Sequence, residues 1–279
     1  MILNKNCLSP ELFLSIYGTK SDLQSACDSA EACWTGFDSL KTSYLQVPYF
    51  PFFGPEYDGL IFAGINLNGG NESFTAIDEL VEIAIDDYLK HGKFKIFKSE
   101  HYGGSPFYYY VPLLSFLYRE YLTGKPLIKN ETQISFEQII SGFQYCGLTN
   151  VIKCSTNSKD GRSKPSWAMY SNCSKKFANE LQRFSCHTLI CFSFFLWPSF
   201  CESLGSFENL ISHDRYRILG NQRIIILELE HPLSTHITRK EKFKNYSKGV
   251  YDLVQITKEK LNETHNKANS ADAKSYTAD

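Results

Sequence analysis

The stretch GLIFAG at residues 59–64 is a short, continuous run of apolar and small residues that ends in glycine. Such a run is typical of a strand buried on both faces, as in a parallel sheet. The loop that follows it, INLNGGNESF at residues 65–74, has three asparagines and two glycines in its first seven residues. Taken alone, this loop is typical of a flexible turn. A buried strand that opens onto amides and glycines also suits a backbone that approaches a ligand.

The rest of the chain alternates between strand and helix patterns. Helical spacing of apolar residues is clear in several segments, and continuous apolar runs separate them. We expect further strands at 147–154, 187–195 and 222–230, and helices at 74–93, 165–184, 238–261 and within 103–122 beyond Pro112. This alternation predicts an α/β fold, a three-layer α/β/α sandwich with a central, mainly parallel four-stranded sheet. We expect one domain over residues 1–261 and a disordered tail over 262–279.

Composition narrows the classes of function. The 279 residues are 43% hydrophobic, which is ample for a sizeable core, and the net charge is −1. No general basic field therefore steers the protein to nucleic acid or anionic lipid. The N-terminus lacks the pattern of a signal peptide, and the apolar run at 187–200 is too short to span a membrane. We expect an intracellular protein without membrane contact, in the cytoplasm or nucleoid, or in a nucleus.

Several common catalytic motifs do not fit. The loop at 65–74 has neither the Gly-Lys-Ser/Thr ending of a Walker loop nor the spacing of a dinucleotide fingerprint. The segment EHPLSTH at 230–236 offers two histidines, but a proline intervenes and the spacing is not that of a helical zinc motif. There is no G-x-S-x-G elbow for a serine hydrolase. Pro232 instead favours a shaped loop that presents His231.

Four motifs together resemble the uracil-DNA glycosylase superfamily. They are GINLNGG at 64–70, GGSPFYYYVPLLSFL at 103–117, LTNVIKCSTNSKDGRSKPSWAMYSNC at 148–173 and HPLST at 231–235. They occur in the order found in that superfamily and cover about residues 25 to 240. The chain is most similar to the iron–sulfur-containing group, and its Gly-Ile-Asn start is like that of members in which an asparagine positions the attacking water.

The resemblance implies a role for each motif residue. Asn66 would position water, Phe107 would stack on the base, and Asn150 would read the base edge. His231 would stabilise the negative charge that develops on the leaving base. Leu233 would wedge into the gap that a flipped base leaves. As simpler interpretations, Phe107 is a core residue and Asn150 caps a turn.

The cysteines extend the resemblance. Iron–sulfur members carry two cysteines before the first motif, one after the second strand and one in the next helix, which here match Cys27, Cys33, Cys154 and Cys173. Four thiolates are what a [4Fe–4S] cluster requires. The first pair is more widely spaced here than in that group. A zinc site and four ordinary thiols are the alternatives.

The implied activity is that of a monomeric DNA repair glycosylase. It would hydrolyse the N-glycosidic bond of uracil, or a related deaminated base, in DNA. Two departures from the pattern favour the alternative, a catalytically inactive member that binds nucleic acid or a protein. Leu67 replaces the usual proline with Asn68 inserted after it, and the glycine turn after the third strand is absent.

Overall fold

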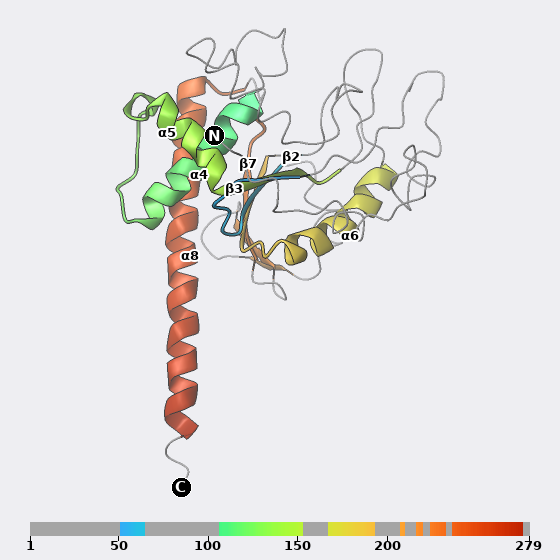
Figure 1. Ribbon diagram of the computed structural model, residues 1–279, viewed down its shortest axis with the longest axis vertical. Coiled ribbons are helices and arrows are strands. Elements are labelled where there is room, and N and C mark those ends of the chain that lie inside the picture. The colour runs from blue at the N-terminus through green and yellow to red at the C-terminus, as the bar shows by residue number, and fades with distance from the viewer. Residues whose placement is uncertain are drawn as a thin grey trace.

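A computed structural model describes residues 51–64, 106–152, 167–192, 207–209, 216–219, 224–232 and 236–275. In these segments the chain forms a mixed β-sheet accompanied by helices, which confirms the predicted α/β class. Figure 1 shows α4, α5 and α8 together on one side of the strands and α6 on the other. The predicted helix at 74–93 lies outside the described residues.

The sheet has seven described strands in the order β1-β3-β2-β4-β7-β6-β5. The pairs β3·β2, β2·β4 and β4·β7 are parallel, and the outer pairs are antiparallel. The strand bounds are β1 Phe52–Phe53, β2 Leu60–Gly64, β3 Cys146–Asn150, β4 Thr188–Phe192, β5 Phe207–Asn209, β6 Tyr216–Leu219 and β7 Ile224–Leu229.

The sheet is therefore larger and more mixed than the four strands that the sequence predicts. Those four correspond to β2, β3, β4 and β7, and the additional strands are β1, β5 and β6. Each additional strand is two to four residues long, too short to show a period in its sequence. Their pairing with strands already in the sheet defines them.

The parallel strands contain a topological switch point. From β2 the chain continues to β3 on one side of it, and then crosses to β4 on the other side. In open α/β sheets, ligands bind in the crevice outside the carboxyl ends of the strands at such a point. Here the switch point lies between the carboxyl ends of β2 and β4.

Helix α4 spans Pro106–Leu122, so it begins before Pro112, whereas the sequence predicted a helix only beyond this proline. Pro112 lies inside the helix and removes the hydrogen bond to the carbonyl of Tyr108, a loss that costs about 3 kcal/mol in an exposed helix. Burial outweighs it, because Val111, Leu113 and Leu114 are fully buried on either side of the proline.

The remaining helical elements are η2 Glu131–Gln133, α5 Phe136–Ser141, η3 Gly142–Gln144, α6 Trp167–Arg183 and α8 Arg239–Ser275. Helix α6 matches its prediction closely. Capping boxes at Asn130 and Ser135 start η2 and α5, which the sequence analysis did not find. Helix α8 continues well past the expected end at residue 261, because 262–275 contains no glycine or proline to stop it. Residues 276–279 lie outside the described part.

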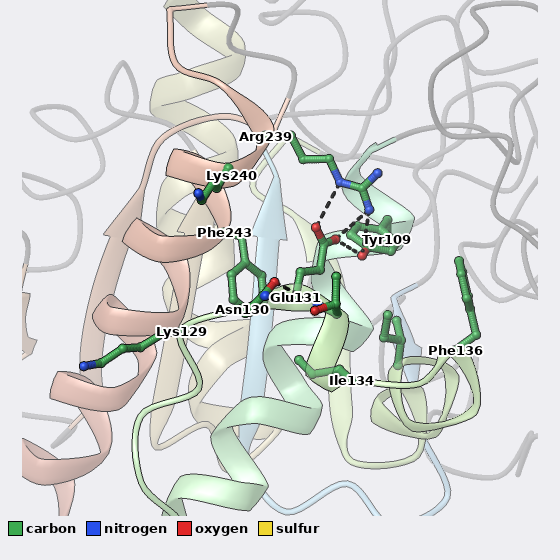
Figure 2. A pocket seen from close by; sticks show the side chains of 11 residues that line it. Tyr109, Lys129, Asn130, Glu131, Ile134, Phe136, Arg239, Lys240 and Phe243 are labelled. Atoms are coloured by element: carbon green, nitrogen blue, oxygen red, sulfur yellow. Dashed lines mark hydrogen bonds and ion pairs between the residues drawn. The ribbon is translucent and has the colours of Figure 1, made fainter.

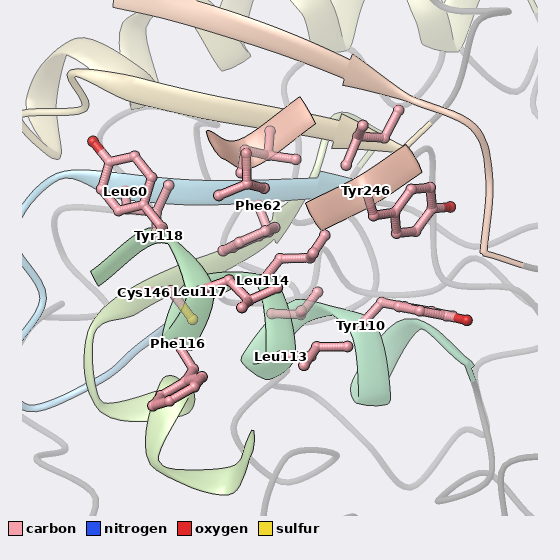
Figure 3. Close-up of a cluster of buried hydrophobic side chains, with 14 of the residues drawn as sticks. Leu60, Phe62, Tyr110, Leu113, Leu114, Phe116, Leu117, Tyr118, Cys146 and Tyr246 are labelled. Carbon is pink, nitrogen blue, oxygen red and sulfur yellow. The ribbon is translucent and has the colours of Figure 1, made fainter. Parts of the chain in front are cut away.

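Each face of the sheet packs against its own helices. On one face, α4 and α8 cover a large apolar cluster that includes Leu60, Phe62 and Tyr246 (Figure 3). On the other face, Phe177 and Leu181 of α6 cover the alternate strand residues. No described helix is long and apolar enough to cross a membrane.

Candidate functional site

The carboxyl ends of the parallel strands place several of the predicted site residues at one edge of the sheet. Alternate residues of a strand face the same side. Gly64 and Asn150 therefore share the α4/α8 face with buried Phe62 and Leu148, which lie two residues earlier in their strands. Phe192, at the end of β4, belongs to the same face. This edge includes the switch point between β2 and β4.

Gly64 brings Asn150 and Phe107 together. Gly64 is the register partner of Asn150, and the Val151 amide donates to its carbonyl over 3.0 Å. A Cβ at position 64 would lie 2.7 Å from Asn150 Oδ1 and 3.3 Å from two ring carbons of Phe107. Any side chain at this position would displace the amide or the ring, so the close approach requires glycine.

Asn150 has an amide with unused hydrogen-bonding capacity. The residue is 5% exposed, and its side chain makes no hydrogen bond to a described residue. Neither polar atom of this amide is among the fully buried atoms that have no partner, so the amide reaches solvent. The turn-capping interpretation of Asn150 has no support within the described segments. An amide of this kind suits a polar ligand.

Phe107 lies in the first turn of α4, at the switch point. Its ring meets Phe192 edge to face, with 5.4 Å between the centroids, and it meets Tyr108 at 5.9 Å. Phe107 packs against the core but is only partly buried. It therefore combines the two sequence interpretations, a contact with the core and a ring that is partly accessible.

His231 follows β7 in a loop that α8 anchors. The hydroxyl of buried Tyr246 donates to the Glu230 carbonyl on one side of the histidine. On the other side, Lys242 Nζ donates to the Pro232 carbonyl over 2.6 Å. The hydrogen bonds on both sides of His231 hold the predicted His-Pro loop to the start of α8.

Burial and charge together keep the imidazole of His231 neutral. Burial lowers the pKa of His231 below its usual value, and the nearby Lys242 ammonium lowers the same pKa further. The pKa of Lys242 is itself lowered by burial, although Glu230 opposes this. A neutral imidazole has one N–H donor and one acceptor nitrogen.

Aromatic contacts connect the two ends of this site. The Phe192 ring, which contacts Phe107, lies 6.0 Å from the ring of Tyr246, and Tyr246 lies 5.1 Å from Tyr110. The hydroxyl of Tyr246 holds the backbone beside His231. The Phe107 end and the His231 end therefore share one packed scaffold. We refer to Gly64, Phe107, Asn150 and His231 as the carboxyl-edge site.

The other predicted site residues are largely outside the described part of the chain. The residues outside it are Asn66, Leu233 and three of the four cysteines, Cys27, Cys33 and Cys154. Cys173 is buried in α6 and packs with Ile152 and Met169. Within the described segments there is no cluster of three or more metal-ligating side chains.

The structure also reveals a pocket that the sequence analysis did not identify. It has a volume of about 510 Å³ and is lined by residues of α4, the 129–139 segment and the start of α8 (Figure 2). Glu131 holds its wall together through a two-pronged ion pair with Arg239 and a hydrogen bond from Tyr109. The basic run at 239–248 was a partial signal, but its partners come from distant segments.

Comparison with known families gives no further assignment. No protein-family model matches the sequence, and no curated protein is similar to it. The carboxyl-edge site and the motif order therefore carry the functional argument.

Proposed function

We propose that the protein is a DNA glycosylase of the uracil-DNA glycosylase superfamily. It would hydrolyse the N-glycosidic bond of uracil, or a related deaminated base, flipped out of DNA. The observation that carries the proposal is the amide of Asn150, which makes no hydrogen bond to a described residue, beside the ring of Phe107, where Gly64 has no side chain. The site lies where α/β sheets bind ligands.

The chemistry of a flipped pyrimidine suits these two side chains. A glycosylase must take its target base out of the stack and into a pocket. The amide of Asn150 has both a donor and an acceptor, which complement the carbonyl and N–H groups on the edge of uracil. A partly exposed ring such as Phe107 offers a stacking face for the base. The amide supplies selectivity and the ring supplies binding energy.

A neutral His231 suits the bond-breaking step. Cleavage of the glycosidic bond leaves negative charge on the departing base and positive charge on the sugar. A hydrogen bond from an imidazole N–H to the base strengthens as that charge develops, so it stabilises the transition state more than the ground state. Neighbouring strands lie about 4.8 Å apart, so the ends of β3 and β7 are roughly 14 Å apart, a span that accommodates a base between Asn150 and His231.

The two remaining roles fall to residues that flank the carboxyl-edge site in sequence. Asn66 follows Gly64 by two residues, and its amide would orient the attacking water. An amide is not a strong base, so this step relies on a stabilised leaving group. Leu233 follows His231 by two residues and would occupy the gap left by the flipped base.

We further propose a [4Fe–4S] cluster held by Cys27, Cys33, Cys154 and Cys173. The packing of Cys173 against Ile152 supports it, because Cys154 is only two residues further along the chain. Such a cluster would tie the N-terminal segment to the sheet. The expected signs are four irons per chain and broad visible absorbance after anaerobic purification. Cys173→Ser would remove both, whereas Cys186→Ser, which changes a buried cysteine outside the set, would leave them unchanged.

Three finer features complete the proposal. The architecture is the three-layer α/β/α sandwich built on the parallel strands, with α4 and α8 in one outer layer and α6 in the other. The protein acts as a monomer on DNA. Its reaction places it inside the cell, in the cytoplasm or nucleoid, or in a nucleus.

A base-release assay tests the activity. DNA oligonucleotides that contain uracil, hypoxanthine or xanthine are incubated with the full chain, and the free base is quantified. We expect release of at least one base, and a loss of about 100-fold or more in Asn66→Ala, Asn150→Ala and His231→Ala. Asn179→Ala, an exposed amide on α6, is the matched control and should keep full activity. Tight DNA binding without any base release would contradict the enzyme and favour the inactive binding module.

A further inference from the structure

The 510 Å³ pocket is separate from the carboxyl-edge site, although both include residues from the start of α4. Its volume is within the range of small-molecule sites. We propose that this pocket holds one nucleotide of single-stranded DNA that flanks the target base, with the phosphate at Lys129 and Lys240 and the ring on Phe136. The identification of the strand as DNA rests on the proposed function.

The wall of the pocket is preformed. Arg239 donates to both carboxylate oxygens of Glu131, over 2.7 and 3.0 Å, and also to the hydroxyl of Tyr109 over 3.1 Å. The guanidinium carbon lies 5.3 Å from the centre of the Tyr109 ring. A two-pronged arginine–carboxylate pair holds its partners in a defined geometry. Glu131 is thereby neutralised and does not repel an incoming anion.

The lining carries an excess of positive charge. The lining includes three cations, Lys129, Arg239 and Lys240, and one carboxylate, Glu131. Arg239 is held by Glu131, whereas the two lysines are exposed and form no ion pair with any described residue. Flexible, solvated lysines are common phosphate ligands. The charge therefore favours a phosphate-bearing ligand, even though the chain as a whole is close to neutral.

The opposite side of the pocket is aromatic. Figure 2 shows Phe136 across the pocket from Lys129 and Lys240, with Phe243 between them. Phe243 is 2% exposed and belongs to the floor, while Phe136 is only partly buried. The aromatic ring on one side suits the base of a nucleotide, and the cations on the other side suit its phosphate.

The location of the pocket explains how one strand would reach both sites. Phe107 and Tyr109 belong to the same turn of α4, the first at the carboxyl edge and the second in the pocket wall. Arg239 begins α8 only eight residues after His231. A strand with its target base in the carboxyl-edge site would thus pass a pocket built for the next part of the same strand.

A binding experiment tests the proposal. The fluorescence anisotropy of a fluorescein-labelled oligothymidylate of ten nucleotides is measured as the full chain is added, at NaCl concentrations from 50 to 300 mM. Each phosphate contact to a single strand contributes about 0.7 to the slope of log Kd against log salt. Because Lys129 and Lys240 hold the same phosphate in this proposal, the double variant Lys129→Ala/Lys240→Ala should reduce the slope by about 0.7. It should also raise Kd about tenfold. Phe136→Leu should raise Kd about fivefold or more with an unchanged slope, since stacking is not ionic.

A matched control removes the same charge elsewhere. Lys244 and Lys248 are exposed on α8 but outside the pocket, so Lys244→Ala/Lys248→Ala should change Kd less than twofold. An equal effect of the two lysine pairs, or no effect of Phe136→Leu, would overturn the proposal. The proposal would also be overturned if free thymidine monophosphate displaced the oligonucleotide completely when both were present at the same concentration of phosphate groups. That result would indicate a site for a free mononucleotide.

The two proposals fail in different ways. The oligothymidylate contains no uracil, so its binding is measured without base release. Absence of base release with pocket-dependent oligonucleotide binding would contradict the proposed function alone. Base release with oligonucleotide binding that ignores the pocket variants would contradict this inference alone.

Discussion

Gly64 is the residue on which the carboxyl-edge site depends most directly. It ends a buried strand, and the absence of a side chain lets Asn150 and Phe107 approach the same space. Glycine weakens a strand interior, so its presence there usually marks a close approach of other groups. The amide-rich loop after GLIFAG is thus preceded by the one residue type that keeps this space open.

Gly64→Ala should close that space. The new Cβ would meet Asn150 Oδ1 at 2.7 Å, so the amide must move. We expect base release to fall at least tenfold. The free energy of unfolding should fall by only about 1 kcal/mol, because the oxygen at the end of the Asn150 side chain can rotate away. Urea unfolding and the base-release assay measure the two effects. In an Asn150→Ala background the stability loss should be smaller, and equal losses in both backgrounds would refute the contact.

His231 should make stability depend on pH. Its pKa is lowered in the folded protein, so between the folded pKa and the ordinary value near 6.5 the unfolded chain binds more protons than the native one. Stability should therefore fall as pH decreases from about 7 through this window, and then level off once both states are protonated. Urea midpoints from pH 5 to 8 measure this trend. His231→Gln should flatten it, and an unchanged profile in that variant would assign the effect to another group.

The first turns of helix α8 position the loop that carries His231, in addition to packing against the sheet. Lys242 and Tyr246 hold the carbonyls of Pro232 and Glu230, one on each side of the histidine. A loop held from both sides by one helix keeps a constant orientation. The element therefore couples packing of the α4/α8 face to the geometry of the carboxyl-edge site.

Tyr246→Phe tests this coupling. It removes only the hydroxyl that donates to the Glu230 carbonyl and keeps the ring contacts with Phe192 and Tyr110. We expect a loss of about 1 kcal/mol in the free energy of unfolding, together with a several-fold loss of base release. Tyr251→Phe is the matched control, since Tyr251 lies in α8 as Tyr246 does but packs on Tyr121 of α4, away from the loop. A loss in the control equal to that in Tyr246→Phe would contradict the role of the hydroxyl.

At the scale of the whole molecule, the long end of α8 and the packed body can be separated. Figure 1 shows α8 extending past the other elements toward the C-terminus. The last buried side chain described on the helix is that of Thr257. The stability of the body should therefore depend on α8 only as far as this region.

Two truncations test that division. A chain ending at residue 261 should lose helical circular dichroism signal yet keep its Tm within about 2 °C, because surface changes are small. A chain ending at residue 252 loses Leu253 and Val254, both fully buried, and should lose several kcal/mol. A large drop in Tm for the first truncation would show that residues 262–275 pack against the body.

Much of this architecture was readable from local pattern. The continuous apolar runs at β2, β4 and β7 and the amphipathic period of α6 each lie within one short segment, so the sequence predicts them well. The strands β1, β5 and β6 were missed because each is too short to show a period of its own, and β1 in addition depends on pairing with the distant strand β3. Pro112 shows the reverse case, in which burial of its neighbours outweighs an unfavourable local residue.

The candidate site divides in the same way. The identities of Asn150, Phe107 and His231 came from motifs, because chemical roles follow from residue type and order along the chain. Their gathering at one edge, the contact of Gly64 with Asn150, and the pocket of Glu131 and Arg239 join segments 40 to more than 100 residues apart. Such contacts arise from strand order and helix packing, which depend on the free energy of the whole core rather than on any one segment.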